Sequence, residues 1–288
     1  MNDNFCAFIL SHGRADNVIT YRTLRKQGYT GKIYIIIDDE DSQADKYYEN
    51  YPGEVIMFSK ADYEGKIDKM DNFGNRKVIV YARNACWDIA EKLGIEYFIQ
   101  LDDDYTEIQC KVNERLEYKY SLPNIDSIFD VLLKYYKNIN VLSVAMAQCG
   151  DYIGGIKGGG GDIIRKQPKR KCMNSFICCT KNRFWFRGTM NEDVNTYIEL
   201  GGRGGVFLTI PYLAVNQTAS QKGRGGMTDI YLGSGTYRKS YYTVMCAPSC
   251  ARVAVLHDRY SRLHHLISWN NAVPCIIREG HKKSGYDL

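Results

Sequence analysis

Short runs of apolar residues alternate with amphipathic segments over the first hundred residues of the chain. The runs are rich in β-branched and aromatic residues and predict strands, while the segments between them predict helices. The strands are expected at 6–10, 32–38, 54–58 and 96–101. The helices are expected at 17–27, 41–50 and 82–93. Because apolar strands separated by helices are covered on both faces, this part predicts a mostly parallel sheet that binds ligands beyond the carboxyl ends of its strands.

The second part of the chain shows the same two patterns in a less regular order. Strands are expected at 141–147, 175–180 and 205–210. Helices are expected at 125–136, 192–200 and 237–245. No linker of disordered composition separates the two parts. We therefore expect one continuous α/β body, in which the second part places loops over the first.

The composition is that of an ordinary folded protein, since 44% of the residues are hydrophobic, 25% are charged and only 6 are proline. The opening segment holds six consecutive apolar residues, Phe5 to Leu10, whereas roughly 18 are needed to cross a bilayer. We therefore expect no membrane span, no secretory signal and a cytoplasmic location. The ten cysteines are scattered and form no CxxC pair, so we expect reduced core residues and no structural zinc.

The net charge of +5 is concentrated in one segment. Residues 157–171 (KGGGGDIIRKQPKRK) hold six basic residues and one acid, which equals the whole excess. The glycines around 154–161 and Pro168 indicate a loop over 154–171, and a basic loop suits the phosphates of a nucleic acid or a nucleotide. A solvated surface loop is the alternative. The basic candidates for nucleic-acid contact are Arg165, Lys166, Lys169, Arg170 and Lys171.

Three adjacent carboxylates follow the fourth predicted strand, in the sequence QLDDDY (100–105). Side chains alternate along an extended chain, which puts Asp102 and Asp104 on one side and Asp103 on the other. Hard divalent ions such as Mg²⁺ and Mn²⁺ prefer carboxylate oxygen and leave positions for substrate phosphates. The cluster therefore indicates a metal site, with an acidic turn after a strand as the alternative.

Polar motifs precede this cluster at corresponding strand or helix ends, namely SHGRADN (11–17), IIDDE (36–40) and ARNACWDIA (82–90). In this order and spacing they resemble the nucleotide-sugar glycosyltransferases of the GT-A fold. The resemblance implies a Rossmann-like sheet and a divalent metal, Mn²⁺ or Mg²⁺. It also implies a donor-binding half over 1–106 and an acceptor-binding half over 107–288 within a single domain.

The same resemblance assigns roles to single residues. Those implied to bind the donor are Ser11, Arg14 and Asn17 at the nucleotide, Asp38 or Asp39 at uracil or ribose, Arg83 at the diphosphate and Asp103 at the sugar or ribose. Asp102 and Asp104 become the metal-binding DxD pair. For Arg14, Arg83 and Asn17 the alternatives are surface ion pairs and a helix cap.

Two acids in the second part, Glu192 and Asp193, stand at the start of a predicted helix. The helix dipole alone would favour them there. The GT-A resemblance implies instead that one of them is the base toward the acceptor hydroxyl, Asp193 first and Glu192 second. A base there favours inversion of the anomeric centre.

Three of the five histidines, His257, His264 and His265, lie near the C-terminus of the chain. The resemblance implies that one of them completes the metal sphere, and His264 and His265 are our candidates, while a core histidine is the alternative. Lys239, which follows Arg238, is a candidate for the diphosphate or else points to water.

Taken over the whole chain, the motifs look most like the phage-encoded TET-associated glycosyltransferases. This resemblance implies transfer of a sugar from a UDP-sugar to 5-hydroxymethylcytosine or 5-hydroxymethyluracil in DNA, in the host cytoplasm. Trp185 is a candidate for stacking on an extruded base, or else part of the core. Two other classes stay open: a glycosyltransferase acting on protein, lipid or glycan, and a non-enzymatic nucleic-acid-binding protein. A nucleotidyltransferase is disfavoured because SHGRADN is not a Gly-rich loop ending in Lys.

Overall fold

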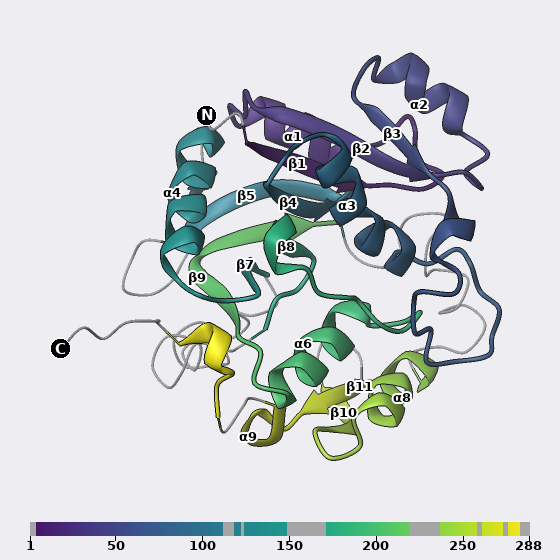
Figure 1. The fold of residues 1–288 in the computed structure, drawn as a ribbon, viewed down its shortest axis with the longest axis vertical. Helices are drawn as coiled ribbons and strands as arrows, with labels where there is room; N and C mark the ends of the chain where they lie inside the picture. The colour runs from purple at the N-terminus through teal and green to yellow at the C-terminus, as the bar shows by residue number, and fades with distance from the viewer. Residues whose placement is uncertain are drawn as a thin grey trace.

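The computed structural model describes residues 4–111, 118–121, 124–148, 171–218, 237–257, 261–272 and 276–282. Within these residues, nine strands form one sheet in the order β3-β2-β1-β4-β8-β7-β9-β5-β6, and β10 and β11 form a separate hairpin. Figure 1 shows the sheet in the upper part of the molecule and the hairpin below it, next to α8 and α9.

The first four strands are parallel and lie side by side. They are β1 (Phe5–Leu10), β2 (Lys32–Asp38), β3 (Val55–Phe58) and β4 (Tyr97–Asp102). The helices between them are α1 (Ile19–Lys26), α2 (Ala44–Asn50) and α3 (Val80–Lys92), with the 3₁₀ turn η1 at Lys60–Tyr63. Since β1 pairs with both β2 and β4, the loops that follow these three strands start from one edge of the sheet.

The second part of the chain extends the sheet beyond β4 with mixed directions. Its strands are β5 (Tyr105–Lys111), β6 (Tyr118–Ser121), β7 (Ser143–Gln148), β8 (Ser175–Cys179) and β9 (Phe207–Gln217). Only β7 and β9 pair in parallel here, whereas β8 runs antiparallel to β4 and β7, and β5 runs antiparallel to β9 and β6. The sheet is therefore parallel in its first half and mixed in its second.

Further elements follow in the second part. They are α4 (Ile125–Asn138), η4 (Thr180–Asn182), α6 (Glu192–Gly202), α8 (Tyr237–Cys246), β10 (Ala251–His257), β11 (Ser261–Ile267), α9 (Trp269–Ala272) and η5 (Glu279–His281).

Both faces of the sheet are buried, as the continuous apolar runs predict. Alternate residues of β1 enter two different core clusters: Phe5 and Ile9 pack with residues of α1, α2 and α4, whereas Phe8 and Leu10 pack with residues of α3 and α6. A strand with no polar face needs cover on both sides. The predicted α/β class, the helices on both faces and the single body are confirmed.

Two further expectations can be compared with the structure. The eight cysteines within the described residues are all free, as expected from their scatter. No helix in the described part of the chain is long and apolar enough to cross a membrane.

Candidate active site

The acidic turn that follows β4 is the centre of the candidate site. Thr20, on α1, fixes its backbone by donating from Oγ1 to the carbonyl of Asp102 at 2.5 Å and from its amide to the carbonyl of Asp103 at 3.0 Å. The carboxylate of Asp103 is 5% exposed and turns toward the loop after β1. There it accepts hydrogen bonds of 2.6 Å from both Ser11 Oγ and Arg14 Nη1. Three of the residues predicted at the donor are thus in direct contact.

Asp102 points to the opposite side, toward α3. Its Oδ1 accepts a 2.7 Å bond from Nη2 of Arg83, and Nε of the same guanidinium lies 3.3 Å from Oε1 of Glu192. Arg83 is only 1% exposed, and its guanidinium carbon lies 5.0 Å from the ring centroid of Phe176 and 5.8 Å from that of Phe186. The alternative of a surface ion pair is therefore wrong for Arg83, because it is a buried cation between two acids.

The predicted base, Asp193, lies at the start of α6, next to Glu192, which contacts Arg83. Asn191 precedes the helix in a left-handed conformation (φ 51°), and its side-chain amide donates to the Lys239 carbonyl at 2.8 Å and to Thr243 Oγ1 at 2.9 Å, both on α8. Asp193 is 6% exposed and its Oδ1 accepts from the Val194 amide at 2.7 Å. Residues of α3, β4, α6 and α8 thus meet at one place.

Crowding of acids in a buried place sets the protonation of this group. Burial raises the pKa of Asp102 to about 7, against the opposing charge of Arg83. Burial and the neighbouring Glu192 raise the pKa of Asp193 to about 6, although Arg83 and Lys239 act against this. Burial also raises the pKa of Asp103 and of Asp104. Burial is the largest cause for all four acids, because it penalises the charged carboxylate, and a nearby cation acts against that penalty.

Asp102 and Asp104 are the predicted ligands of a hard divalent ion. Oδ1 of Asp102 accepts from Arg83, and Oδ2 of Asp104 accepts from Thr218 Oγ1 at 3.3 Å. One or two carboxylates, completed by substrate phosphates and water, are a usual protein contribution to Mg²⁺ binding. No three His, Cys, Asp or Glu side chains within the described residues form a group that could hold a metal. That His264 or His265 completes the metal sphere stays a prediction.

The two histidines occupy a different environment, on β11. Their rings stack with centroids 4.4 Å apart. Burial, His264 and the charge of Lys239 lower the pKa of His265 to about 3, and burial and Lys239 also lower that of His264. A lowered pKa favours the neutral imidazole, which is the form that binds metal ions, whereas the charge of Lys239 acts against a cation at this place. For His257 only the backbone, at the end of β10, is described.

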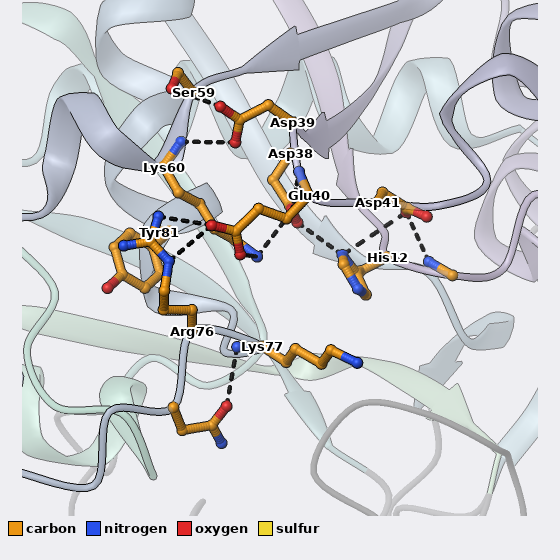
Figure 2. A network of polar contacts seen from close by, with 12 residues as sticks. His12, Asp38, Asp39, Glu40, Asp41, Ser59, Lys60, Arg76, Lys77 and Tyr81 are labelled. Atoms are coloured by element: carbon orange, nitrogen blue, oxygen red, sulfur yellow. Dashed lines mark hydrogen bonds and ion pairs between the residues drawn. The ribbon is translucent and has the colours of Figure 1, made fainter.

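A second polar network joins the loops after β1, β2 and β3 (Figure 2). Asp38 accepts a 2.8 Å bond from His12 Nδ1 and lies 2.8 Å from Nζ of Lys60, which is 2% exposed. Glu40 lies 3.4 Å from the same ammonium and 2.7 Å from Arg76. Asp39 points away from them and accepts from Ser59 Oγ at 2.6 Å and from the Lys60 amide at 3.0 Å. Of the two candidates, Asp38 is the one that reaches the loop after β1.

Sequence reasoning missed His12 and Lys60 in this network. Burial by itself raises the pKa of Asp38, but the hydrogen bonds from His12 and Lys60 outweigh it, so the pKa lies below its ordinary value and the group is a carboxylate. His12 could have been found, because it directly follows the Ser11 of the quoted motif. Lys60 lies in a segment of polar composition, where the sequence gives no sign of a buried lysine.

Other predicted residues lie away from the acidic turn or outside the described residues. Asn17 is exposed, and its Oδ1 accepts a 2.7 Å bond from Arg22 Nη2. It does not cap α1, whose N-cap is Val18, and its contact with the nucleotide stays a prediction. Lys239 is half-buried beside Asp193. Trp185 is also half-buried, with the guanidinium carbon of Arg183 4.4 Å from its ring centroid.

The basic segment is described only at its last residue. Lys171 is 7% exposed, and its carbonyl accepts a 2.7 Å bond from Thr209 Oγ1. This burial argues against a phosphate contact by Lys171, which needs a side chain at the surface. The remaining candidates, Arg165, Lys166, Lys169 and Arg170, lie outside the described residues.

Comparisons with known proteins add to this geometry. The family model of the TET-associated glycosyltransferases matches residues 5–226. The comparison with curated proteins found no match. Among solved structures, a mycobacterial protein is 9% identical with a TM-score of 0.46, over 91% of this chain and 83% of that one. The mannosyltransferase PcManGT from Pyrobaculum calidifontis, in complex with GDP-Man and Mn²⁺, is 10% identical with a TM-score of 0.44, over 85% and 73%. S. aureus TarS is 13% identical with a TM-score of 0.43, over 76% of this chain and 37% of its own.

The family match includes every strand of the nine-stranded sheet, the acidic turn after β4, Arg83 and the acids at the start of α6. It ends before α8 and the β10–β11 hairpin. Because it spans well over half of the 288 residues, the chain belongs to the TET-associated glycosyltransferase family and is a glycosyltransferase.

Proposed function

We propose that this enzyme transfers a sugar from a nucleoside-diphosphate sugar, with UDP as the expected nucleotide, to the hydroxymethyl group of a 5-hydroxymethylpyrimidine in DNA. One observation carries the proposal: the buried Arg83 contacts both Asp102, in the acidic turn, and Glu192, which directly precedes Asp193. A site for a diphosphate leaving group and a base for an acceptor hydroxyl would thus be adjacent. The non-enzymatic alternative is set aside, because the family is one of glycosyltransferases.

The donor side is assigned to the loops after β1, β2 and β4. Asp38, held as a carboxylate by His12 and Lys60, would accept hydrogen bonds from the uracil or ribose. Asp102 and Asp104 would hold Mn²⁺ or Mg²⁺, which when bound offsets the negative charge of the leaving diphosphate. Ser11 and Arg14 orient Asp103, which is then the group nearest to the sugar or ribose in this assignment.

In the proposed transfer step, Asp193 acts as the base toward the acceptor hydroxyl. The acceptor hydroxyl oxygen forms a bond to the anomeric carbon while the bond from that carbon to the diphosphate oxygen breaks, and the electron pair of the broken bond leaves with the diphosphate. The hydroxyl proton passes to the Asp193 carboxylate. Glu192 is the less suitable base, because its carboxylate is next to the Arg83 guanidinium.

DNA is favoured as acceptor by the family description and by the basic segment 157–171, which carries the whole net charge of the chain. Phosphate contacts come chiefly from Arg and Lys. A protein or glycan acceptor is the second candidate, since it would use the same donor site. An enzyme of phage DNA would act in the host cytoplasm.

Mass spectrometry of intact oligonucleotides tests the proposal. Duplexes with 5-hydroxymethylcytosine or 5-hydroxymethyluracil, and an unmodified duplex as control, are incubated with the enzyme, Mn²⁺ and a mixture of UDP-sugars. We expect a hexose or N-acetylhexosamine increment on a modified duplex alone, and its loss with EDTA. UDP release without any increment on DNA would move the acceptor to protein or glycan.

Variants make the test specific to the site. Asp102→Asn and Asp104→Asn should abolish the increment, whereas Asp45→Asn, an exposed acid on α2, should leave it intact. Full activity of a folded Asp102→Asn variant would overturn the metal assignment. Replacing Lys166, Lys169 and Arg170 by Gln should raise the KM for DNA and flatten its dependence on salt. Replacing Lys26, Lys92 and Lys134, which are exposed on α1, α3 and α4, by Gln provides a control that removes the same three charges.

A further inference from the structure

One face of α8 is exposed and rich in aromatic side chains. Tyr237, Tyr241 and Met245 recur at every fourth position and are 58%, 45% and 51% exposed. The two tyrosine rings are parallel to within 5°, with centroids 6.0 Å apart. Phe73, which is 50% exposed, lies under the guanidinium of Arg238 at 3.4 Å from ring centroid to guanidinium carbon. Several large apolar side chains exposed at one place on a surface indicate a binding face.

The opposite face of α8 contacts the segment that leads into Glu192 and Asp193, the two acids predicted to act in catalysis. The carbonyl of Lys239 and the hydroxyl of Thr243 accept from the Asn191 amide, next to Glu192 in the chain. Tyr242 is fully buried against the segment before α6, where its hydroxyl accepts from the Thr189 amide at 2.9 Å. A helix is about 10–12 Å across, which is the length of a few nucleotides of one DNA strand. The exposed tyrosines and Asn191, which stands two residues before the predicted catalytic base Asp193, thus lie on opposite faces of this one helix.

The charge around this face is positive. The described residues of 237–272 include Arg238, Lys239, Arg252 and Arg262 but no Asp or Glu, and both Arg252 and Arg262 are exposed. Two acids lie near α8. Asp71 turns inward, 2.8 Å from the Tyr242 hydroxyl, whereas Asp68 is exposed and lies 3.8 Å from Arg187. Since the basic residues outnumber these acids, this part of the surface favours a polyanion.

We propose that the exposed face of α8, formed by Tyr237, Tyr241 and Phe73 with Arg238, is a platform on which unpaired bases of the DNA acceptor stack. The inference rests on the proposed function and names the surface by which the acceptor is held. Aromatic rings stack on any base, and arginine can add a cation–π or phosphate contact, so the platform binds single-stranded or locally opened DNA without reading its sequence. It would hold the strand next to the base whose hydroxymethyl group reacts.

Fluorescence anisotropy with a labelled single-stranded oligonucleotide containing one 5-hydroxymethylcytosine tests this surface. Tyr237→Ser combined with Tyr241→Ser should weaken binding by at least about fivefold, the low end of the effect of removing a stacked aromatic ring. The KM for DNA in transfer should rise with it. The matched control combines Tyr48→Ser and Tyr135→Ser, two tyrosines that are 44% and 41% exposed on α2 and α4, and should bind as the wild type does.

An oligonucleotide with abasic sites flanking the target separates stacking from a structural effect. On it, the wild type and the α8 double variant should bind almost equally, because there are no bases left to stack. Equal binding of both proteins to the intact oligonucleotide would overturn the platform and leave the proposed function standing. A wild-type enzyme that transfers sugar to no DNA would overturn the proposed function, and the platform with it. Loss of self-association in the variant, with DNA binding intact, would assign the face to a second copy of the chain and also overturn the proposal.

Discussion

Arg83 and Asp102 form an ion pair within the first part of the chain, and Arg83 also contacts Glu192 in the second part. The Arg83 guanidinium, on α3, donates to the Asp102 carboxylate at the end of β4 over 2.7 Å and also faces Glu192 at the start of α6. Arg83 is 1% exposed, so its guanidinium depends on these two carboxylates and not on solvent for its charge partners. The pair therefore links the stability of the fold to the geometry of the site.

Arg83→Met should destabilise the protein strongly. Removing one partner of a buried pair leaves uncompensated charge and typically costs about 3–5 kcal/mol of the free energy of unfolding. Urea unfolding at neutral pH measures this. The control is Arg203→Met, since Arg203 is 62% exposed and its partner Glu199 keeps a 2.7 Å contact with Arg187. The control should cost less than about 1 kcal/mol, and equal losses in the two variants would contradict the central position of Arg83.

The pH dependence of transfer should show an acidic limb set by Asp193. A base must be deprotonated to accept the acceptor proton, and the pKa of Asp193 is raised to about 6 by burial and by Glu192. We expect kcat to fall about tenfold per pH unit below that value. Glu192→Gln should keep a limb and move it to lower pH, because it removes a neighbouring negative charge. A limb that is unchanged in Glu192→Gln would indicate that another group titrates.

Asp193→Asn should be inactive and yet more stable than the wild type at alkaline pH. A raised pKa means that the folded state binds more protons than the unfolded state between about pH 4 and pH 6. The stability that protonated Asp193 allows is therefore complete at low pH and is lost as the pH rises through about 6. An uncharged amide does not undergo this loss, so the free energy of unfolding of Asp193→Asn at pH 8 should exceed that of the wild type by on the order of 1–3 kcal/mol. Chemical denaturation at pH 8 and pH 4 checks the sign, since the gain should shrink at pH 4.

The first half of the fold could be predicted from the sequence because its strands are buried on both faces. The run 32–38 coincides with β2, the predictions for β1 and β3 differ by one residue at one end, and that for β4 is shifted by one residue at both ends. The strands β5, β6 and β11 were not predicted. Their sequences, YTEIQCK, YKYS and SRLHHLI, carry polar residues, and β5 pairs with β9, which is distant in the sequence.

Part of the site could also be predicted, for a related reason. Polar residues directly after parallel strands lie at the same edge of the sheet, independently of the conformation of the loops. Ser11, Asp38 and Asp103 could therefore be placed there. Alternation along the strand also predicted that Asp102 and Asp103 point to opposite sides, but it does not say which side chains they contact. Asp102 turns to Arg83 and Asp103 to Arg14 because each carboxylate meets a cation from a different element, and such partners depend on packing. The burial of Lys60 is set in the same way.

Gly188→Ala should lower the free energy of unfolding more than the same change at another glycine with a similar positive φ. Gly188 has φ +83°, and a Cβ there would lie 2.7 Å from Nδ2 of Asn195 and 3.0 Å from Cε1 of Tyr242. Gly53, on the surface, has φ +78° and nothing within 4 Å of its Cβ position. Gly53→Ala should therefore report the backbone strain alone, about 1–2 kcal/mol.

The difference between the two variants then measures the clash beside the catalytic group. Overpacking adds about 1–3 kcal/mol, so Gly188→Ala should cost about 2–5 kcal/mol in urea unfolding. Tyr242 cannot yield easily, because its buried hydroxyl contacts Asp71 and the Thr189 amide. Any shift must therefore pass along 188–191 to Glu192 and Asp193, and we expect kcat to fall in Gly188→Ala but not in Gly53→Ala. Equal stability and equal kcat in the two variants would show that α8 does not constrain the position of the predicted base.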